Sequence, residues 1–380
     1  MAFALAWTLL GLYYVQDVGL SPLELLLVGA ALEAACFLLE TPTGVIADVY
    51  SRRLSVILGA VFLGLGMLFT ALLPSFWGIL FAMLVCAVGY TCLSGATQAW
   101  LADEVGEAAA STLYLRGSQV SRLGGMAGIP LAAALALWGL NVPVALGGVT
   151  LLTLALWLRL RMPEQGFAPL PPEERQHWAT LTATFRQGAS EIRKSHVLTG
   201  LVLASLLFGA SGEAFDRLKE FLLVREIGLP HSGHVAALLA GLAFVTHLVG
   251  FTVTTALTRR FESVTPRQAA AALHWVLLLS VAGMLAFAYA PSFWLAAFAA
   301  IIYGVLSGLY FPLYTAWLNH GLDSRSRATV NSIASQADAL GQVSFGPLFG
   351  LVGNLTGVRL ALLVRLPMLA VMRRIENRTK

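Results

Sequence analysis

The chain has 380 residues, of which 58% are hydrophobic and only 12% are charged. A typical soluble domain has about 45–50% apolar and about 25% charged residues, so this composition excludes an ordinary soluble globular protein. The formal net charge of +4 comes from basic residues scattered through separate polar segments, which argues against a nucleic-acid-binding face.

The apolar residues fall into about twelve runs, most of them long enough to cross a hydrocarbon core of roughly 30 Å as a helix. The sequence therefore predicts an all-α, polytopic membrane protein. The first run lacks the basic segment and cleavage site of a signal peptide, so we expect it to be the first spanning helix. Because it is short for a span, we expect its start to be truncated. The predicted helices cover residues 1–15, 22–46, 54–73, 76–99, 118–138, 142–158, 197–215, 235–257, 269–289, 293–317, 328–352 and 358–372.

The longest polar segment divides these helices into two sets of six. The predicted domains are residues 1–161 and 197–373, joined by a cytoplasmic linker at 162–196 and followed by a tail at 374–380. Within the linker, apolar residues recur at near-helical spacing among charges, which predicts an amphipathic helix at the membrane surface. These residues are Trp178, Leu181, Phe185 and Ile192.

The basic residues indicate the orientation in the membrane. An even number of spans places both termini on one side, and roughly 18 of the 24 lysines and arginines fall at that face. Positive charge accumulates on the cytoplasmic side of membrane proteins. The sequence therefore predicts a multi-pass protein of the cell inner membrane with both termini in the cytoplasm.

Residues for chemistry on a substrate are not apparent. Cys36, Cys86 and Cys92 all lie within apolar runs and have neither disulfide nor metal-ligand spacing. The sequence contains no nucleotide-binding loop and no nucleophile with a base in a plausible site. We therefore expect no metal, no cofactor and no enzymatic activity.

An internal repeat supports the division into halves. Pro74-Ser-Phe-Trp77 recurs as Pro291-Ser-Phe-Trp294, and Ala99-Trp-Leu101 recurs as Ala316-Trp-Leu318, each at an offset of 217 residues (291 − 74 and 316 − 99). Because an even number of helices separates the copies, the halves are parallel repeats related by an axis along the membrane normal. This is the arrangement of the two halves of major facilitator transporters.

A polar loop between the second and third predicted helices reads Gly44-Val-Ile-Ala-Asp48-Val-Tyr-Ser51-Arg52-Arg53. It resembles the signature loop of the major facilitator superfamily, although Val49 stands where that pattern has its first arginine and Ser51 where it has a glycine. Gly44 can allow two helices to approach closely. Asp48 can face the positive N-terminal end of another helix, which in the family is the eleventh.

The arginines of this loop have two explanations. Arg52 or Arg53 can pair with the acidic end of the fourth predicted helix, where Asp103 and Glu104 lie. The resemblance implies that such a pair takes part in conformational coupling. Simple anchoring at the cytoplasmic surface is the alternative.

Glycine and proline mark the fifth and eleventh predicted helices. The pattern is similar to the glycine-and-proline motif of antiporter members of the superfamily, which mildly favours export. It also serves ordinary helix packing, since glycine permits close approach and proline bends a helix. The residues are Gly124, Gly128 and Pro130 in the fifth helix, and Gly341, Gly346 and Pro347 in the eleventh.

Ionisable residues within predicted spans are candidates for proton or substrate binding, because a charge in hydrocarbon is costly. We hypothesise that Glu33 or Asp338 carries a coupling proton, with Arg122 as the balancing charge or an anion contact. Buried ion pairs that orient helices are the structural alternative, and packing is expected for His247 and His274. The full set is Glu33, Glu40, Arg122 and Asp338, with Glu213 and Asp216 as a second site or outer gate.

These features predict a secondary transporter that moves a small solute by alternating access around a site near the bilayer midplane. The favoured form is proton-coupled export of an amphipathic or drug-like compound by a monomer in the lipid bilayer, with no nucleic-acid partner. Proton-coupled import of a nutrient is the nearest alternative. A non-transporting membrane sensor or scaffold is the alternative of another class.

Overall fold

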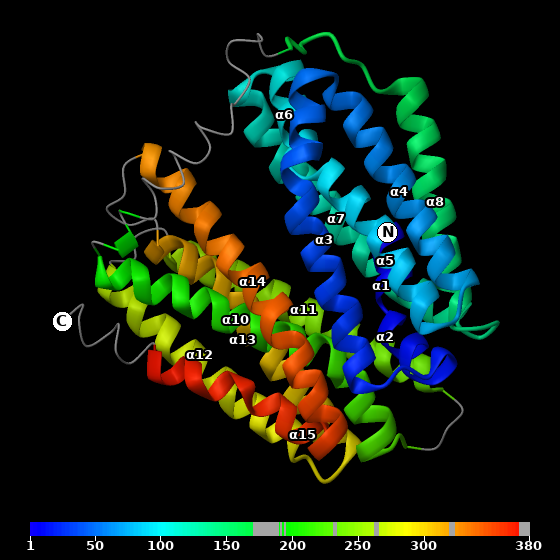
Figure 1. The fold of residues 1–380 in the computed structure, drawn as a ribbon, viewed down its shortest axis with the longest axis vertical. Coiled ribbons are helices and arrows are strands. Elements are labelled where there is room, and N and C mark those ends of the chain that lie inside the picture. The colour runs from blue at the N-terminus through cyan, green and yellow to red at the C-terminus, as the bar shows by residue number, and fades with distance from the viewer. Residues whose placement is uncertain are drawn as a thin grey trace. The chain divides into compact units, whose positions relative to one another are not determined.

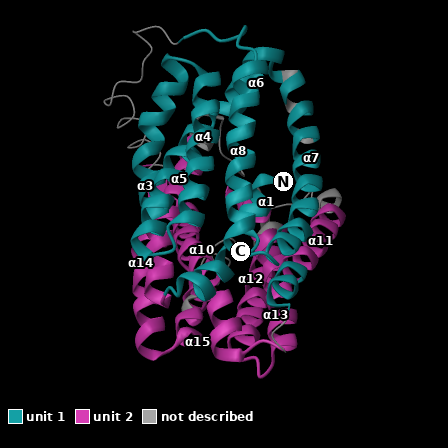
Figure 2. Ribbon diagram, turned by 90° about the vertical axis from the view of Figure 1, so that its right-hand side faces the viewer, with its two compact units in different colours: residues 1–20, 31–175, 234–241 teal, residues 21–30, 176–233, 242–380 magenta. Residues whose placement is uncertain are grey.

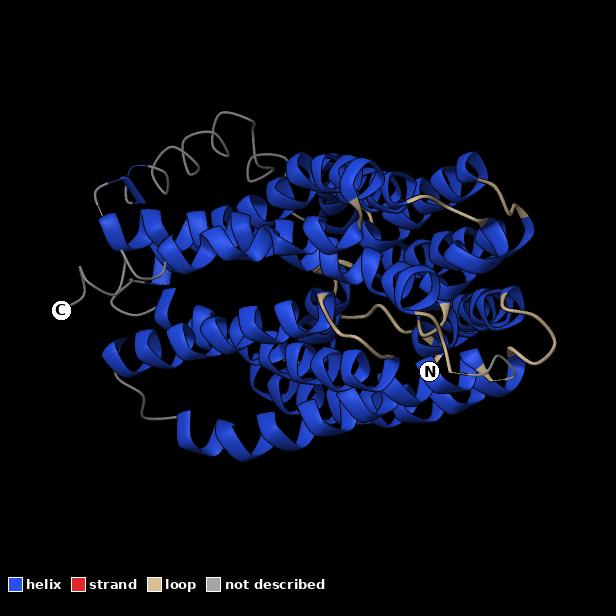
Figure 3. Cartoon of the chain, turned by 90° about the horizontal axis from the view of Figure 1, so that it is seen from below, coloured by secondary structure: helices blue, strands red, loops and turns tan. Residues whose placement is uncertain are grey.

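The structure is a computed structural model, and it describes residues 1–169, 190, 192–193, 195–230, 234–261, 266–318 and 324–371. Among these residues all regular structure is helical and no strand occurs (Figure 3). The all-α fold class is confirmed for this part of the chain. The predicted amphipathic helix at 173–194 falls almost wholly outside the described residues, and the predicted tail at 374–380 lies outside them.

The chain separates into two compact units (Figure 2). The first contains Met1–Leu20, Ala31–Arg175 and His234–Gly241, and the second contains Ser21–Ala30, Gln176–Gly233 and Leu242–Lys380. The long helices α3 (Pro22–Val49) and α11 (Val235–Phe261) therefore each supply residues to both units.

The first unit is organised around α4 (Arg52–Leu72), which packs on α5 (Phe76–Leu93) and on α8 (Asn141–Arg161). Figure 1 shows α4 and α8 side by side. The short helix α1 (Ala2–Trp7) packs on α7 (Glu107–Leu135) and on α8. The remaining elements are α2 (Leu10–Tyr13), a π-helical turn at Tyr14–Val18 and α6 (Ala96–Val105).

Glycines allow α4 to approach its neighbours closely. A Cβ atom at Gly59 would lie 3.0 Å from the Gly89 carbonyl oxygen of α5, and one at Gly64 would lie 2.9 Å from the Gly148 carbonyl oxygen of α8. Larger residues at these positions would push the helices apart. Small residues at helix contacts are typical of membrane proteins, where van der Waals packing drives helix association.

The second unit is built on two helix pairs. α10 (His196–Phe221) packs on α14 (Ser324–Thr356), and α12 (Pro266–Ala288) packs on α13 (Phe293–Leu318). α10 also contacts a 3₁₀ turn at Leu362–Arg365, which follows α15 (Val358–Ala361). A π-helical turn at Leu222–Ile227 extends α10.

The helix starts keep the spacing of the sequence repeat. α5 and α13 begin at Phe76 and Phe293, at an offset of 217 residues (293 − 76). The packing repeats as well, since α4 contacts α5 as α12 contacts α13, and α1 contacts α7 as α10 contacts α14. Each unit thus uses the same pairing of helices.

Several helices differ from the predicted bounds. The predicted helix 1–15 is divided into α1 and α2 at Thr8 and Leu9. The predicted helix 76–99 ends at Leu93, because Gly95 has φ of 73°, a left-handed conformation that glycine adopts readily. The predicted helix 118–138 begins earlier, at Glu107, because polar residues in its first turns hide it from a hydropathy criterion.

Eight of the described helices are long and apolar enough to cross a membrane. α7 and α14 lie at the predicted spans 118–138 and 328–352 but are more polar, and α1, α2 and α15 are short. Length and composition therefore support a multi-pass membrane protein, and they identify eight of the twelve predicted spans.

Candidate functional site

The signature-type loop of the first unit is organised around Arg52 at the start of α4. Its Nη1 atom donates hydrogen bonds to the Asp103 carboxylate of α6 and to the Ala99 carbonyl oxygen at 3.0 Å. The Asp48 carboxylate, near the end of α3, lies 3.8 Å from Nη2. The structure therefore contains the pair with Asp103 that the sequence suggested, and Arg52 lies between two carboxylates.

The beginning of the linker closes this cluster. Glu164 accepts hydrogen bonds from the Ser51 hydroxyl at 2.7 Å and from the Arg53 backbone N–H at 2.8 Å, at the N-terminus of α4. Ser51 also caps α4, since its hydroxyl accepts from the Leu54 N–H at 2.9 Å. The Arg53 guanidinium donates to the Arg159 carbonyl oxygen at 2.5 Å. Glu164 is a residue that sequence reasoning missed, because it lies in a polar segment outside the recognised loop.

Glu104, the alternative partner for the arginines, has another role. Its carboxylate accepts from the backbone N–H groups of Gln165 and Gly166 at 2.6 and 2.9 Å. A Cβ atom at Gly44 would meet nothing within 4 Å among the described residues, and the close approach expected there stays a prediction. The proposed partner of Asp48 on the eleventh helix stays a prediction.

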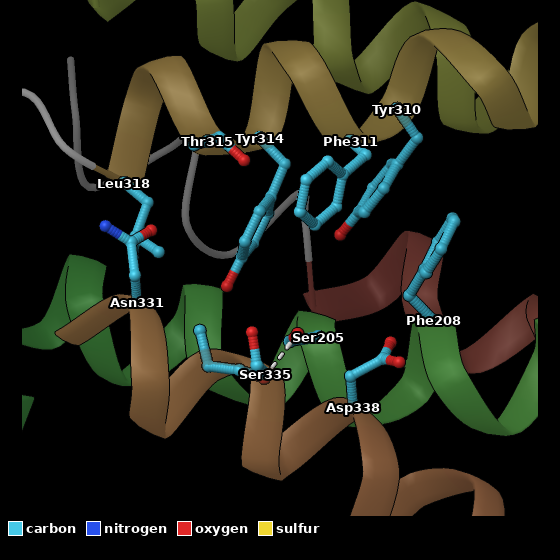
Figure 4. A pocket seen from close by; sticks show the side chains of 11 residues that line it. Ser205, Phe208, Tyr310, Phe311, Tyr314, Thr315, Leu318, Asn331, Ser335 and Asp338 are labelled. Atoms are coloured by element: carbon cyan, nitrogen blue, oxygen red, sulfur yellow. Dashed lines mark hydrogen bonds between the residues drawn. The ribbon is translucent and has the colours of Figure 1, made fainter. Parts of the chain in front are cut away.

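In the second unit, α10, α13 and α14 enclose a cavity of about 140 Å³, which we call the aromatic pocket (Figure 4). Asn331, Ser335 and Asp338 lie on one face of α14, at positions i, i+4 and i+7. Asp338 points from α14 toward the side formed by Phe208 and Tyr310. The other lining residues are Ser205 from α10, Phe311, Tyr314, Thr315 and Leu318 from α13, and Ala334 from α14.

The position of Asp338 is fixed by the crossing of α10 and α14. A Cβ atom at Gly209 would overlap the Asp338 backbone, and one at Gly341 would overlap the Leu206 carbonyl. The Ser205 hydroxyl donates to the Ala334 carbonyl oxygen at 2.8 Å across the same contact. Gly341 therefore packs closely on α10.

The aromatic side chains of the pocket form a stack. The Phe208 and Tyr310 rings are parallel within 7° at a centroid distance of 4.0 Å, and Tyr314 follows Tyr310 at 5.6 Å. The Tyr314 hydroxyl donates to the Leu201 carbonyl oxygen at 3.1 Å. The Tyr310 hydroxyl is buried and has no hydrogen-bond partner among the described residues. Sequence reasoning missed these rings. The four-residue spacing of Tyr310 and Tyr314, which places both on one face of a helix, was the signal that could have indicated them.

Arg365 lies behind this stack. It is 1% exposed, and it donates to the hydroxyls of Tyr303 and, at 3.1 Å, Ser307. Its guanidinium carbon lies 5.0 Å from the centroid of the Phe208 ring. No carboxylate of the described chain lies within 4.0 Å of it. The sequence placed Arg365 within a span but gave no indication of these partners.

Glu213 and Asp216 have different partners in the structure. Glu213 is buried and accepts from Arg217 at 2.8 Å, whereas Asp216 is exposed and lies 3.3 Å from Lys219. A Cβ atom at Gly29 of α3 would overlap the Glu213 carboxylate, so α3 packs directly on this pair. The Glu213–Arg217 ion pair therefore lies at a helix contact.

The remaining predicted residues are spread over both units. Glu33 is half-buried on α3, and Glu40 is exposed on the same helix. Arg122 is exposed on α7, and His247 is exposed on α11 with its ring 2.8 Å from the Ala243 carbonyl oxygen. His274 lies 6.4 Å from Trp275, ring to ring, on α12.

The predicted packing glycines of the fifth and eleventh helices differ in how closely neighbouring atoms approach them. A Cβ atom at Gly128 would lie 2.7 Å from the Ala4 side chain of α1, and one at Gly124 would lie 3.0 Å from the Met1 nitrogen. Gly346 makes only ordinary contacts, at 3.9 Å. Pro130 and Pro347 both lie inside their helices.

The chain has two helical units with the same pairing of helices, a signature-type loop and a pocket among long apolar helices. Together these features define a multi-pass membrane transport protein. The chain belongs to the Major Facilitator Superfamily, whose family model matches residues 1–346. It acts as a membrane transporter of small solutes and is not an enzyme.

Individual relatives agree with this assignment. The "Uncharacterized MFS-type transporter YxaM" of Bacillus subtilis (strain 168) is 23% identical over 343 residues, which cover 88% of this chain and 82% of YxaM. The nucleoside transporter NupG has a similar structure, with a TM-score of 0.74 at 14% identity over 100% of this chain and 96% of NupG. The E. coli fucose:proton symporter FucP gives 0.60 at 17% identity over 100% and 96%. At such identities the structures show a shared fold.

Proposed function

We propose that this transporter exports a small amphipathic solute from the cytoplasm in exchange for protons. The halves at 1–161 and 197–373, joined by 162–196, alternate in access as a monomer in the inner membrane, with both termini cytoplasmic. The observation that carries this proposal is the Asp338 carboxylate in the aromatic pocket.

A carboxylate among aromatic rings is unstable as an isolated charge, because transfer from water to an apolar site is costly. Among the described residues only Gln342 donates a hydrogen bond to Asp338, at 2.9 Å. A proton or a bound solute would each relieve that cost, and the two would compete. If the carboxylate binds either a proton or the solute but not both at once, transport of the solute in one direction is coupled to proton movement in the other.

The signature-loop cluster supplies the conformational element of the proposal. Arg52, at the start of α4, pairs with Asp48 near the end of α3 and with Asp103 on α6. Glu164 connects the same region to the linker through its hydrogen bond with Ser51. Such a network has one arrangement in this structure and would exchange partners when the halves move. Glu33 is the second candidate for the coupling proton.

The test is cargo-induced proton movement in liposomes that contain the purified chain and an internal pH-sensitive dye. A panel of small amphipathic compounds is added outside. Exchange predicts that protons leave as cargo enters, so that the internal pH rises above the change in protein-free liposomes. Import by symport predicts the opposite sign, an internal pH that falls.

Asp338→Asn should abolish this signal, whereas Asp17→Asn should keep it, because Asp17 is an exposed carboxylate outside the pocket. Glu33→Gln tests the second candidate. Undiminished coupling in both Asp338→Asn and Glu33→Gln would remove these residues from the mechanism.

A further inference from the structure

The chemistry of the aromatic pocket indicates a class of cargo. We propose that it binds the protonated amine of an amphipathic organic cation, with Asp338 as counter-ion and the Tyr310 hydroxyl as a second hydrogen-bond acceptor. This inference rests on the proposed transport function, and it adds the charge and shape of the group that is recognised.

The charge of the lining favours a cation. Among the described residues that line the pocket, Asp338 is the only ionisable acid or base apart from the tyrosine hydroxyls. The facing helix α13 contributes Tyr310, Phe311 and Tyr314, and the Phe311 side chain is 62% exposed, so its ring is available to a ligand. A cation near an aromatic face gains about 0.5–2 kcal/mol beyond ordinary contact. A carboxylate together with aromatic rings therefore suits an ammonium group and disfavours an anion.

Asp338 and the Tyr310 hydroxyl keep unused hydrogen-bonding capacity among the described residues. Gln342 is the described residue that donates to Asp338, and it reaches only the Oδ2 atom. The Tyr310 hydroxyl, with its residue 2% exposed, has no partner among the described residues. An ammonium N–H can donate to the carboxylate and to the phenolic oxygen, and buried polar groups are normally satisfied in this way.

The size of the pocket limits what it holds. Its cavity of about 140 Å³ is close to the roughly 150 Å³ of an engineered apolar cavity that binds one benzene molecule. The pocket therefore accommodates a head group or a single ring, and the rest of an amphipathic cargo lies outside it.

Arg365 is the positive charge that must be reconciled with a cationic ligand. It does not line the pocket, because the Phe208 ring separates it from Tyr310. Its guanidinium carbon also lies 4.9 Å from the centroid of the Tyr303 ring, so Arg365 contacts both the Phe208 and the Tyr303 rings. The charge that faces a ligand in the pocket is the Asp338 carboxylate.

The test uses four probes that share a phenylethyl group: 2-phenylethylamine, 2-phenylethanol, 3-phenylpropanoate and N,N,N-trimethyl-2-phenylethylammonium. Binding to the full chain in lipid nanodiscs is measured by calorimetry at pH 7. We expect the amine to bind at least about tenfold more tightly than the alcohol, with the carboxylate weaker still, since a charge-assisted hydrogen bond is roughly twice as strong as a neutral one.

Two variants locate the effect. Asp338→Asn should reduce binding of the amine about tenfold or more and leave the alcohol nearly unchanged, which removes the preference for charge. Tyr310→Phe keeps the ring and should weaken the amine about threefold to tenfold, while the trimethyl probe, which has no N–H, keeps its affinity. Asp17→Asn is the matched control, and thermal unfolding of each variant reports folding.

Equal binding of the amine and the alcohol, or an unchanged preference in Asp338→Asn, would overturn the inference. The liposome assay separates this result from failure of the proposed function. Proton exchange driven equally by neutral or anionic compounds would leave export standing and refute the cationic cargo. Selective amine binding without proton exchange would refute export by exchange and leave the head-group assignment intact.

Discussion

Gly209 of α10 lies directly against the backbone of Asp338 on α14, so that a methyl group at residue 209 would overlap the Asp338 carbonyl. The contact places the acidic residue at a close crossing of the two helices. Any increase in the separation of α10 and α14 therefore displaces the carboxylate from the rings it faces.

Gly209→Ala should lower the stability of the purified protein by about 1–3 kcal/mol, because overpacking forces backbone shifts. It should also weaken amine binding. Gly212→Ala is the matched control on the same helix, since a Cβ atom there would meet nothing within 4 Å. Thermal unfolding in detergent measures both variants. Equal behaviour of the two would contradict the importance of the Gly209 contact.

The pair of Arg52 and Asp103 should be coupled energetically. Their side chains are 19% and 25% exposed, so water screens the pair only in part. Asp103→Asn should cost about 1–2 kcal/mol of unfolding free energy and slow transport. A double-mutant cycle with Arg52→Gln measures the coupling, and Glu107→Gln, at an exposed acid on α7, is the control. Additive effects of the two changes would show that the pair is not coupled.

Ser51 and Glu164 should act as one unit at the start of α4. Ser51→Ala and Glu164→Ala should each destabilise the protein by about 1 kcal/mol, typical of a lost helix cap. Because they share a hydrogen bond, the double variant should cost less than the sum. Gln165→Ala should be neutral, since the Gln165 contact uses its backbone N–H. Chemical unfolding measures the series, and strict additivity would refute the shared role.

Arg365 should tolerate methionine better than lysine. The methionine side chain removes a buried charge that has no carboxylate within 4.0 Å among the described residues, and it keeps apolar contact with Phe208. Arg365→Lys keeps an ionisable group but loses the planar contact with the Phe208 ring and the two hydrogen bonds that Nη1 donates. We expect Arg365→Lys to be less stable than Arg365→Met by about 1–3 kcal/mol in thermal unfolding. The reverse order would show that the charge itself stabilises this region.

The charged residues of the candidate sites could be recognised from the sequence, because an ionisable group stands out within an apolar run. Asp338 was found in this way. Arg52 and Asp103 were found through the signature-type loop, and the partner of Arg52 had to be chosen between two acids. Tyr310 gave no such signal, since an aromatic residue on an apolar helix has the appearance of ordinary packing. Glu164 was hidden in a polar linker, where charge is expected.

The sequence by itself determined the helical membrane fold and its two-fold repeat. Hydrophobic run length and a constant offset of 217 residues (291 − 74) are properties of the chain that need no contact between distant residues. Only the tertiary structure decided the break at Gly95 and the use of Gly209 and Gly341 to hold α10 against α14. It alone placed Asp338 opposite the α13 rings, because the aromatic pocket is formed by side chains from three separate helices, of which α10 is distant in sequence from α13 and α14.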